Sequence, residues 1–380
     1  MSNNLMSNNS MASFSAFDAE MMARALRLAE RGLYLARPNP RVGCVITQND
    51  QVVGEGYHQV FGQAHAEVNA LKQAGSKARG GTAYVTLEPC AHQGKTGPCA
   101  AALINAGVNR VVCAMRDPNP KVDGGGFAML QQAGISVDSG LMAQQAADLN
   151  PGFIKRMQQQ RPLVRLKMAI SADGRTAMAS GESQWITGPD ARQDVQRLRA
   201  RHDAIITGRG TLVNDNPSLN VRLDEWAEPL TEQQLAHFKQ PVRVLIDRQA
   251  KANLTQQFFK LTSPIWWVGD KDYLDRLPPH IERKKVVGNG ADFFNNLLKQ
   301  CAAHQFNEVL IEAGSKLAGQ FIQAGLVDEL VLYIAPKLMG ANAMPLAALP
   351  FDAMEQSVSM QLTDCRQVGD DLKLTYQLSN

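Results

Sequence analysis

The chain has 380 residues, of which 44% are hydrophobic and 20% charged, and this is typical of a globular protein of two or three domains. Its 39 Lys and Arg residues exceed its 36 Asp and Glu residues by only 3, which argues against a nucleic-acid-binding surface. No run of about 18 apolar residues is present, so no membrane span is expected. The six cysteines are too sparse for a disulfide scaffold, and a reducing, cytoplasmic location is expected.

The N-terminal segment, residues 1–15, is rich in Ser, Asn and Met. It lacks the basic and apolar regions of a secretory signal, so a disordered extension is expected. The first patterned segment follows it, with apolar residues at helical spacing. Asp18 is expected to cap this helix, which is predicted to end near Arg31.

A hairpin is predicted next, with a buried strand at 42–46 and a return strand at 51–57 joined by an Asn-Asp turn. Just before it, Asn39 stands between two prolines, which force an extended approach. Asn39 is as readily a turn residue as a group that offers its amide to a heterocycle. It is therefore a candidate substrate-binding residue.

Two motifs predict a zinc site: His-Ala-Glu at 65–67, and Pro-Cys at 89–90 followed by Cys99. One imidazole and two thiolates bind Zn²⁺ and leave a fourth position for water, so His65, Cys90 and Cys99 are the expected metal ligands. Bound zinc lowers the pKa of water from about 16 towards 7. The carboxylate of Glu67 is placed to transfer protons, as in zinc deaminases. Eight residues separate the cysteines here, whereas the general deaminase pattern has two.

The surrounding elements predict where these ligands lie. Helices are expected to begin at His65 and near Pro98, and a strand at 82–87 leads into Cys90. The ligands would then lie at two helix N-termini, whose positive ends favour thiolates. His92, between the cysteines, is more readily a surface residue than a substrate contact.

Strands and helices continue to alternate to about residue 158. Strands are expected at 110–115 and 135–137, and helices at 127–133 and 141–156. This alternation predicts a three-layer α/β/α domain over residues 16–158. The glycine-rich loop at 116–126 would look the same as a phosphate-binding backbone or as a plain connector.

The runs PNPRVGCVI, HAE, EPCAHQGKTGPC and RDPNPKVDGGG together resemble the deaminase domain of the RibD family of bifunctional riboflavin-biosynthesis enzymes. The eight-residue cysteine spacing is a feature of that family, and the resemblance extends to about residue 150. It implies a cytidine-deaminase-like fold. It also implies hydrolytic deamination of 2,5-diamino-6-(5-phosphoribosylamino)pyrimidin-4-one.

A polar joint at 158–162 precedes a second alternating half, residues 162–380. Strands are expected at 163–171, 203–208, 242–247, 264–269, 308–314, 328–336 and 371–378, and helices at 190–201, 291–304 and 315–325. Two long polar stretches, 172–187 and 208–222, are expected to be loops. The strand-to-helix turn at 312–315 is either a tight connection or a phosphate-binding site. Its sequence does not match the G-x-G-x-x-G fingerprint of dinucleotide-binding folds.

The motifs SxDGRTA, SGESQWIT, the long run from Gly208 to Arg222 and EAGSKLAG resemble the reductase domain of the same family, which is dihydrofolate-reductase-like and uses NADPH. The resemblance implies that NADPH is bound by Ala169, Trp185, Thr211, Asp215, Gly314, Ser315, Lys316, Leu317, Ala318, Gly319 and Gln320. It implies that the substrate is bound by Ser183, Arg199, Leu219, Arg222 and Glu312, with the arginines as partners for its phosphate. Lys167 and Asp215 would lie near the reacting sugar. Arg248 stands where relatives often have a small polar residue.

These features predict two successive reactions on a small pyrimidine ribosyl phosphate: zinc-dependent deamination, then NADPH-dependent reduction of the ribosyl to a ribityl group. A homo-oligomer is expected. Two other functions stay open: a zinc deaminase of another nucleoside or nucleic-acid base, and a non-catalytic protein with structural zinc. The small net charge and second domain argue against the former, and Glu67 argues against the latter.

Overall fold

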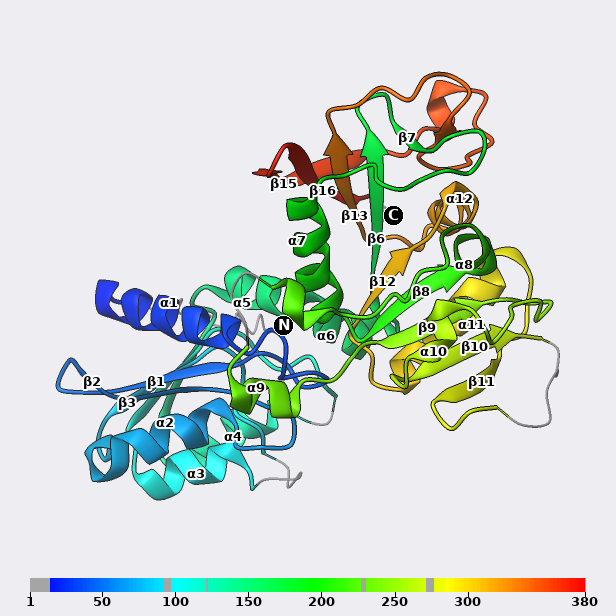
Figure 1. Cartoon of the computed structure of the whole chain (residues 1–380). Coiled ribbons are helices and arrows are strands. Elements are labelled where there is room, and N and C mark those ends of the chain that lie inside the picture. Colours follow the sequence, from blue (N-terminus) through cyan, green and yellow to red (C-terminus); the bar gives the residue numbers. More distant parts are fainter. Residues whose placement is uncertain are drawn as a thin grey trace, which may run out of the picture. The chain divides into compact units, whose positions relative to one another are not determined.

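The computed structural model describes residues 14–91, 97–120, 122, 124–226, 230–270 and 277–379. Residues 1–13 of the predicted extension lie outside these ranges, and so does His92. The chain divides into two compact units, Met1–Gln158 and Gln159–Asn380, each described by itself below (Figure 1). Among the described helices, none is long and apolar enough to cross a membrane.

The first unit is built on a five-stranded sheet in the order β2-β1-β3-β4-β5. The strands are β1 (Gly43–Gln48), β2 (Gln51–Tyr57), β3 (Thr82–Val85), β4 (Arg110–Cys113) and β5 (Ser136–Ser139). One face packs against α2 (Ala66–Ala74), α3 (Cys99–Ala106) and α4 (Gly125–Gln132), and the other against α1 (Ala16–Glu30) and α5 (Ala143–Leu149). The predicted three-layer architecture is therefore confirmed.

Backbone geometry and side-chain hydrogen bonds explain the predicted hairpin and identify a different N-cap residue for α1. Asn49 and Asp50 have φ values of 49° and 59°, as the tight β1–β2 turn requires. The prediction that Asp18 is the N-cap of α1 is wrong, because Ser15 occupies that position. The Ser15 hydroxyl accepts from the Asp18 N–H, and the Asp18 carboxylate accepts from the Ser15 N–H. This reciprocal pair is a capping box.

The single helix predicted at 141–156 is also wrong. The chain forms α5 and then α6 (Pro151–Gln159), because Pro151 has no N–H to continue α5 and is suited to starting a new helix. Asn150 at the break uses its side chain elsewhere. Its Oδ1 accepts from the N–H of Arg41 at 2.7 Å, and its Nδ2 donates to the carbonyl of Arg41 at 2.9 Å.

The second unit contains a nine-stranded sheet in the order β11-β10-β9-β8-β12-β6-β13-β16-β15. Its strands are β6 (Leu163–Ser171), β8 (Ala204–Gly208), β9 (Val242–Ile246), β10 (Ile265–Gly269), β11 (Ile281–Lys285), β12 (Glu308–Glu312), β13 (Glu329–Ala335), β15 (Met360–Val368) and β16 (Asp371–Leu378). The helices are α7 (Pro189–Ala200), α8 (Arg209–Asp215), α9 (Glu232–His237), α10 (Gln257–Lys260), α11 (Gly290–Ala303) and α12 (Ser315–Gln323). Two short strands pair separately, β7 (Arg175–Ala177) and β14 (Met344–Pro345).

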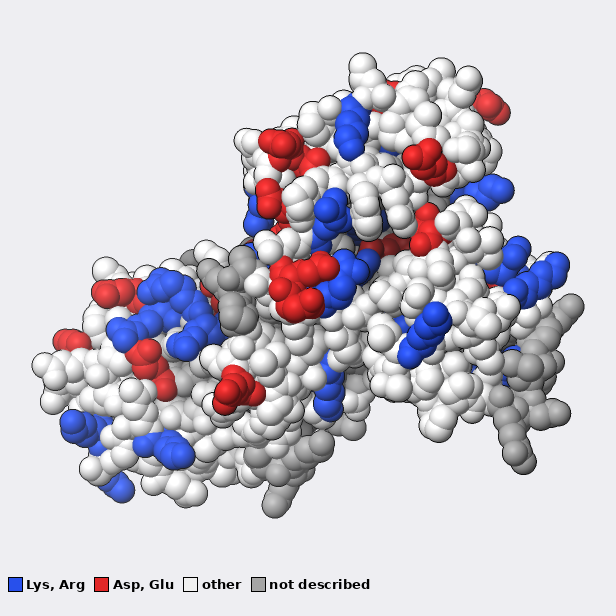
Figure 2. Space-filling model, viewed as in Figure 1, with Lys and Arg blue, Asp and Glu red and all other residues white. Residues whose placement is uncertain are grey.

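The strands from β11 to β13 run parallel, and the β15–β16 hairpin continues the sheet antiparallel. Buried clusters cover both faces, as a parallel sheet requires. The expected α/β class is confirmed. The stretches 172–187 and 208–222, predicted to be loops, contain β7 and α8. Five other elements were not predicted: β11, β14, β15, α9 and α10. On the faces shown in Figure 2, both units carry cationic and anionic side chains, in keeping with a net charge of +3.

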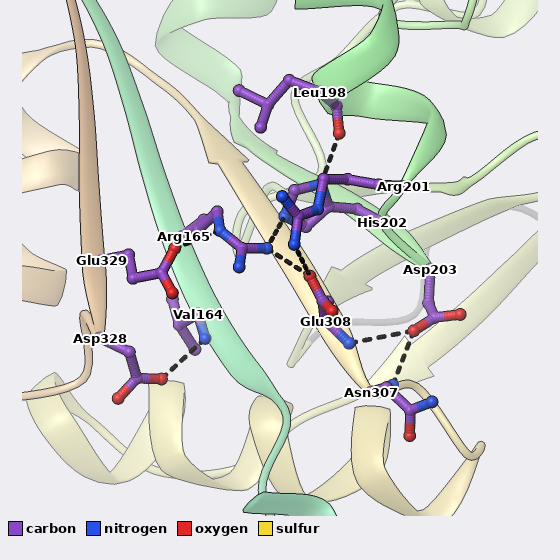
Figure 3. Close-up of polar contacts among 10 residues, drawn as sticks. All are labelled: Val164, Arg165, Leu198, Arg201, His202, Asp203, Asn307, Glu308, Asp328 and Glu329. Carbon is purple, nitrogen blue, oxygen red and sulfur yellow. Dashed lines mark hydrogen bonds and ion pairs between the residues drawn. The ribbon is translucent and has the colours of Figure 1, made fainter. Parts of the chain in front are cut away.

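A buried charged network joins the central strands of this sheet near their amino ends. Arg165 on β6 is only 3% exposed, and its guanidinium pairs with Glu308 on β12 and Glu329 on β13. Its Nη1 also donates to Nε2 of buried His202, at 3.0 Å (Figure 3). Burial lowers the pKa of His202, which keeps this ring neutral and able to accept. A register shift of any of the three strands would leave a buried charge unpaired, so the network fixes their alignment.

Candidate active sites

The three predicted zinc ligands meet in the first unit. One possible ligand atom from each of His65, Cys90 and Cys99 lies within 4.8 Å of the others. Nδ1 of His65 is 3.3 Å from Sγ of Cys99 and 3.7 Å from Sγ of Cys90. A set of one nitrogen and two sulfur donors fits zinc and leaves one position of a tetrahedron open.

The elements place these ligands slightly differently from the prediction. His65 is the N-cap of α2 and Cys99 is the first residue of α3. Cys90 lies in the loop after β3 and not at a helix N-terminus. Its sulfur instead accepts a hydrogen bond from the backbone N–H of Cys99, at 3.4 Å. The Cys99 thiol and N–H, with neighbouring His65, lower the pKa of Cys90, which favours the thiolate needed for metal binding.

Glu67 lies in the first turn of α2, close to these ligands. Its side chain is 3% exposed, and burial raises its pKa to about 7. A carboxyl group with a pKa near neutrality can both accept and release a proton during turnover. The position and environment of Glu67 therefore suit general acid–base chemistry.

Asn39 reaches the same region through His58, which sequence reasoning missed. Nδ2 of Asn39 is 3.1 Å from Nε2 of His58, and Nδ1 of His58 is 3.2 Å from the carbonyl of Ala64. Burial lowers the pKa of His58 to about 4, so its neutral ring donates from Nδ1 and accepts at Nε2. The His58 ring also packs edge-on against His65, with centroids 5.2 Å apart. No sequence signal marked His58, because nothing in its neighbourhood matches a motif.

The second unit holds a cavity of about 820 Å³. Residues at the carboxyl ends of β6, β8 and β12 line it, which is where open parallel sheets bind ligands. The predicted residues in its lining are Ala169, Ser183, Trp185, Arg199, Thr211, Asp215, Leu219, Arg222, Glu312, Gly314, Ser315, Lys316 and Leu317.

Three predicted cofactor contacts do not line this cavity: Ala318, Gly319 and Gln320. Ala318 and Gly319 are buried within α12, and a Cβ on Gly319 would lie 2.2 Å from the carbonyl of Ala348. Gln320 is exposed. The helical turn of α12 carries these side chains away from the cavity after Leu317, so the part of the predicted NADPH run that lines the cavity is Gly314 to Leu317.

An ion pair organises the polar wall of the cavity. Nε and Nη2 of Arg199 donate to the two carboxylate oxygens of Glu312 at 2.6 and 3.0 Å. Burial alone would raise the pKa of Glu312, but Arg199 and Lys167 lower it. Burial lowers the pKa of Lys167, which also lines the cavity. Arg222 pairs with Glu225 at 2.5 Å, so both arginines predicted to bind phosphate are engaged by carboxylates here.

Further contacts hold the polar loops at the rim. Ser183 donates to Asp215 at 2.7 Å, and the hydroxyl of Thr211 accepts from the N–H of Gly314 at 3.2 Å. The guanidinium of Arg192 lies 4.7 Å from the ring centre of Trp185. Sequence reasoning missed Arg192 and Gln196, which line the cavity with Arg199. Their i, i+4, i+7 spacing on α7 was the available signal, because it places all three on one helix face.

Arg248 lies outside the cavity lining. Its Nη2 donates to Asp270 and Asn289, both at 3.0 Å, and to the carbonyl of Gly288 at 3.1 Å. Its contacts therefore hold neighbouring loops together.

Comparisons with known proteins match both units. The family described as "RibD C-terminal domain" matches residues 162–374, and "Cytidine and deoxycytidylate deaminase zinc-binding region" matches residues 15–115. A riboflavin biosynthesis protein RibD from Haemophilus influenzae is 49% identical over 369 residues, covering 96% of this chain and 99% of the relative. Its counterpart from Escherichia coli is 47% identical over 362 residues, covering 94% and 98%.

Solved structures agree with these sequence matches. RibD from Acinetobacter baumannii (form 1) is 44% identical, with a TM-score of 0.89 over 96% of this chain and 99% of that chain. A diaminohydroxyphosphoribosylaminopyrimidine deaminase/5-amino-6-(5-phosphoribosylamino)uracil reductase from Thermotoga maritima is 29% identical. Its TM-score is 0.84, over 96% and 99% of the two chains.

Proposed function

Because the chain belongs to the RibD family and is a bifunctional deaminase and reductase of riboflavin biosynthesis, we propose the substrate and the residue roles of its two sites. The deaminase domain uses zinc and the reductase domain uses NADPH. The proposed first reaction is hydrolytic deamination of 2,5-diamino-6-(5-phosphoribosylamino)pyrimidin-4-one, by residues 16–158. The second is reduction of the ribosyl to a ribityl group, by residues 162–380. The name of the Thermotoga maritima relative, which covers both chemistries, supports this assignment.

The deaminase assignment rests on one observation above all: three metal-ligand atoms converge beside a buried glutamate. We propose that His65, Cys90 and Cys99 hold the zinc ion. Zinc, when bound, lowers the pKa of a coordinated water. Glu67 accepts a proton on its carboxylate and delivers it to the departing amine. Asn39, held by His58, binds the pyrimidine ring through its amide.

In the reductase domain, NADPH supplies the hydride when bound. We propose that it is bound by Ala169, Trp185, Thr211, Asp215 and the turn from Gly314 to Leu317. The backbone N–H groups in the first turn of α12 suit a phosphate of the cofactor. Ser183, Leu219 and Arg222 bind the sugar phosphate, and Arg199 fixes the carboxylate of Glu312 towards the cavity. Lys167, beside Glu312, faces the reacting sugar.

A coupled assay on the purified protein tests this function. We expect ammonia release from the diaminopyrimidinone ribosyl phosphate without NADPH, and NADPH oxidation only after deamination. Cys90→Ser should lose zinc and ammonia release while still oxidising NADPH when the deaminated compound is supplied. Cys365→Ser is the matched control, because this thiol is exposed. Absence of ammonia from protein that contains one zinc per chain would mean that the deaminase acts on a different substrate.

We also propose that the protein self-associates through the β15–β16 hairpin. Among the described residues, β15 forms one edge of the large sheet, and an exposed edge strand is a template for pairing. Cross-strand register places Met360, Leu362 and Leu372 on one face, and they are 44%, 51% and 45% exposed. A second copy would cover this apolar face. Light scattering should give a dimer for the native chain and a monomer for Leu362→Glu.

A cytoplasmic location is proposed from the cysteines. All six are unpaired, and zinc-binding thiolates need a compartment that keeps them reduced.

A further inference from the structure

Glu88 precedes the proposed zinc ligand Cys90 by two residues and lies outside the proposed set of metal, acid–base and substrate groups. Its side chain is 3% exposed. Its carboxylate accepts four backbone hydrogen bonds from one distant segment. Oε2 accepts from the N–H groups of Asp117 at 3.3 Å and Gly124 at 3.1 Å. Oε1 accepts from Gly126 at 3.0 Å and Phe127 at 3.3 Å.

The same segment packs directly against the backbone that carries Cys90. A Cβ on Gly126 would lie 1.9 Å from the carbonyl oxygen of Pro89, so only glycine fits there. A Cβ on Gly125 would lie 3.5 Å from Cβ of Ala91. We name residues 117–120 and 124–127 the wall segment, because they lie along 88–91 beside the zinc ligand.

The wall segment is also ordered from within. Oδ1 of Asp117 accepts from the N–H of Asn119 at 2.8 Å, and the carbonyl of Asn119 accepts from the N–H of Val122 at 2.8 Å. Asp117 itself is buried. The segment is therefore ordered by its own hydrogen bonds, and Glu88 anchors both of its ends.

Acceptance of four backbone hydrogen bonds requires a carboxylate at position 88. Four N–H groups point at Glu88, and an ionised carboxylate is purely an acceptor, whereas an amide presents two N–H donors of its own. Two of the four N–H groups belong to the first turn of α4, whose N-cap Gly124 has no side chain, and the positive end of a helix favours an anion. A glutamine at position 88 would turn its own NH2 group towards buried backbone N–H groups. Some of these N–H groups would then lack an acceptor.

We propose that Glu88 is a positioning residue for deamination: it holds the wall segment against the Cys90 backbone, so that this segment forms one side of the pyrimidine substrate's binding site. This inference rests on the proposed deaminase function. Glu88 touches neither substrate nor the reacting atoms; it acts through the wall segment. Its loss should therefore weaken substrate binding and leave the metal and Glu67 in place.

The test compares Glu88→Gln with Glu20→Gln, a matched change at an exposed position on α1. Four quantities are measured on the full chain: zinc per chain, kcat and KM for ammonia release, and NADPH oxidation with the deaminated compound supplied. We expect Glu88→Gln to raise the deaminase KM by about tenfold or more, the cost of a buried donor left unsatisfied. Zinc content, reduction and the deaminase kcat should stay close to those of Glu20→Gln. Glu88→Asp keeps the charge on a shorter side chain, and its KM should lie between those of the native chain and Glu88→Gln.

Three results would overturn the proposal: an unchanged KM, loss of zinc, or a parallel loss of both activities. If Glu88→Gln cannot be purified in soluble form, Gly126→Ala replaces it. That variant disturbs the same contact without changing a charge, and the same results support or overturn the proposal. Failure of the proposed function is distinguishable, because then the native chain itself would release no ammonia.

Discussion

At the scale of single residues, two buried glutamates of the first unit differ because their surroundings differ. Glu67 lies on a helix beside the proposed metal ligands, and burial raises its pKa to about 7. Glu88 is equally buried, but four backbone N–H groups compensate its charge. The first environment suits a group that exchanges protons, whereas the second suits a side chain that holds structure through its hydrogen bonds.

Glu67→Gln should retain zinc and lose at least about a hundredfold in deaminase kcat, because general acid–base catalysis contributes factors of this size. The side chain keeps its shape but can no longer accept a proton. Ammonia release and metal analysis check this, with Glu20→Gln as the control. NADPH oxidation with the deaminated compound should be unaffected. A metal-free variant, or one with native turnover, would contradict the proposed role of Glu67.

At the scale of elements, side chains from separate segments hold strands and helices in register. In the first unit, Asp18 on α1 accepts from the hydroxyl of Tyr84 on β3 at 2.9 Å and from Arg110 on β4 at 2.7 Å. In the second unit, Arg165 links β6 to β12 and β13. In both cases a polar group is buried with its partners already in place, so removal of one partner leaves an uncompensated charge.

Asp18 should make the stability of the first unit depend on pH. Burial alone would raise its pKa, but hydrogen bonds from Arg110, Ser15 and Tyr84 lower it from 3.8 to about 2. A carboxyl group with a lowered pKa stabilises the fold above its unfolded pKa and loses that contribution as the pH falls towards the folded value. The contribution is ~2 kcal/mol at neutral pH and disappears between about pH 4 and pH 2.

Comparison of the native chain with Asp18→Asn isolates this effect. Pulse proteolysis in urea, with peptides from the first unit identified by mass spectrometry, gives the stability difference at each pH. We expect the difference to shrink between about pH 4 and pH 2. A difference that is constant over this range would show that the ionised carboxylate contributes nothing.

Arg165→Met should lower the free energy of unfolding of the second unit by about 3–5 kcal/mol, because it leaves buried carboxylates unpaired. The control is Arg366→Met. Arg366 forms an ion pair with Asp364 at 2.8 Å, but its side chain is 59% exposed, so a loss of about 1 kcal/mol or less is expected. All four tryptophans lie in the second unit, and their fluorescence in urea therefore reports on it alone. Equal losses in the two variants would contradict the role of burial.

At the scale of the whole molecule, each unit has its own buried clusters and its own site. Two clusters belong to the first unit and two to the second. The proposed metal ligands all lie in the first unit, and the residues that line the cavity all lie in the second. Each unit therefore has what a domain needs to fold and act.

Division of the chain between Gln160 and Arg161, just after α6, should yield two active pieces. The piece 1–160 is expected to release ammonia, and the piece 161–380 to oxidise NADPH with the deaminated compound. Each rate should lie within about threefold of the intact chain, since separate cores allow separate folding. A soluble piece without activity would show that its site needs the other unit.

Features that depend on local spacing could be predicted from the amino-acid sequence. Alternating strands and helices predicted both α/β units. The candidate zinc ligands could be named because their types and order carry the chemistry directly. The β1–β2 turn was predictable for the same reason, since Asn49-Asp50 tolerates positive φ. Within the second unit, the motifs named most of the residues that line the cavity, up to Leu317.

Tertiary structure alone decided the features that depend on contacts between distant positions. The anchoring of the wall segment by Glu88, the link from His58 to Asn39 and the pairing of Arg165 with Glu308 join residues far apart in the chain. The exposed strand β15 lay in a segment without motifs, because its conformation is set by pairing with β16. Such contacts leave no periodic pattern in the sequence, since each partner alone is an ordinary polar or strand residue, and only folding brings the two together.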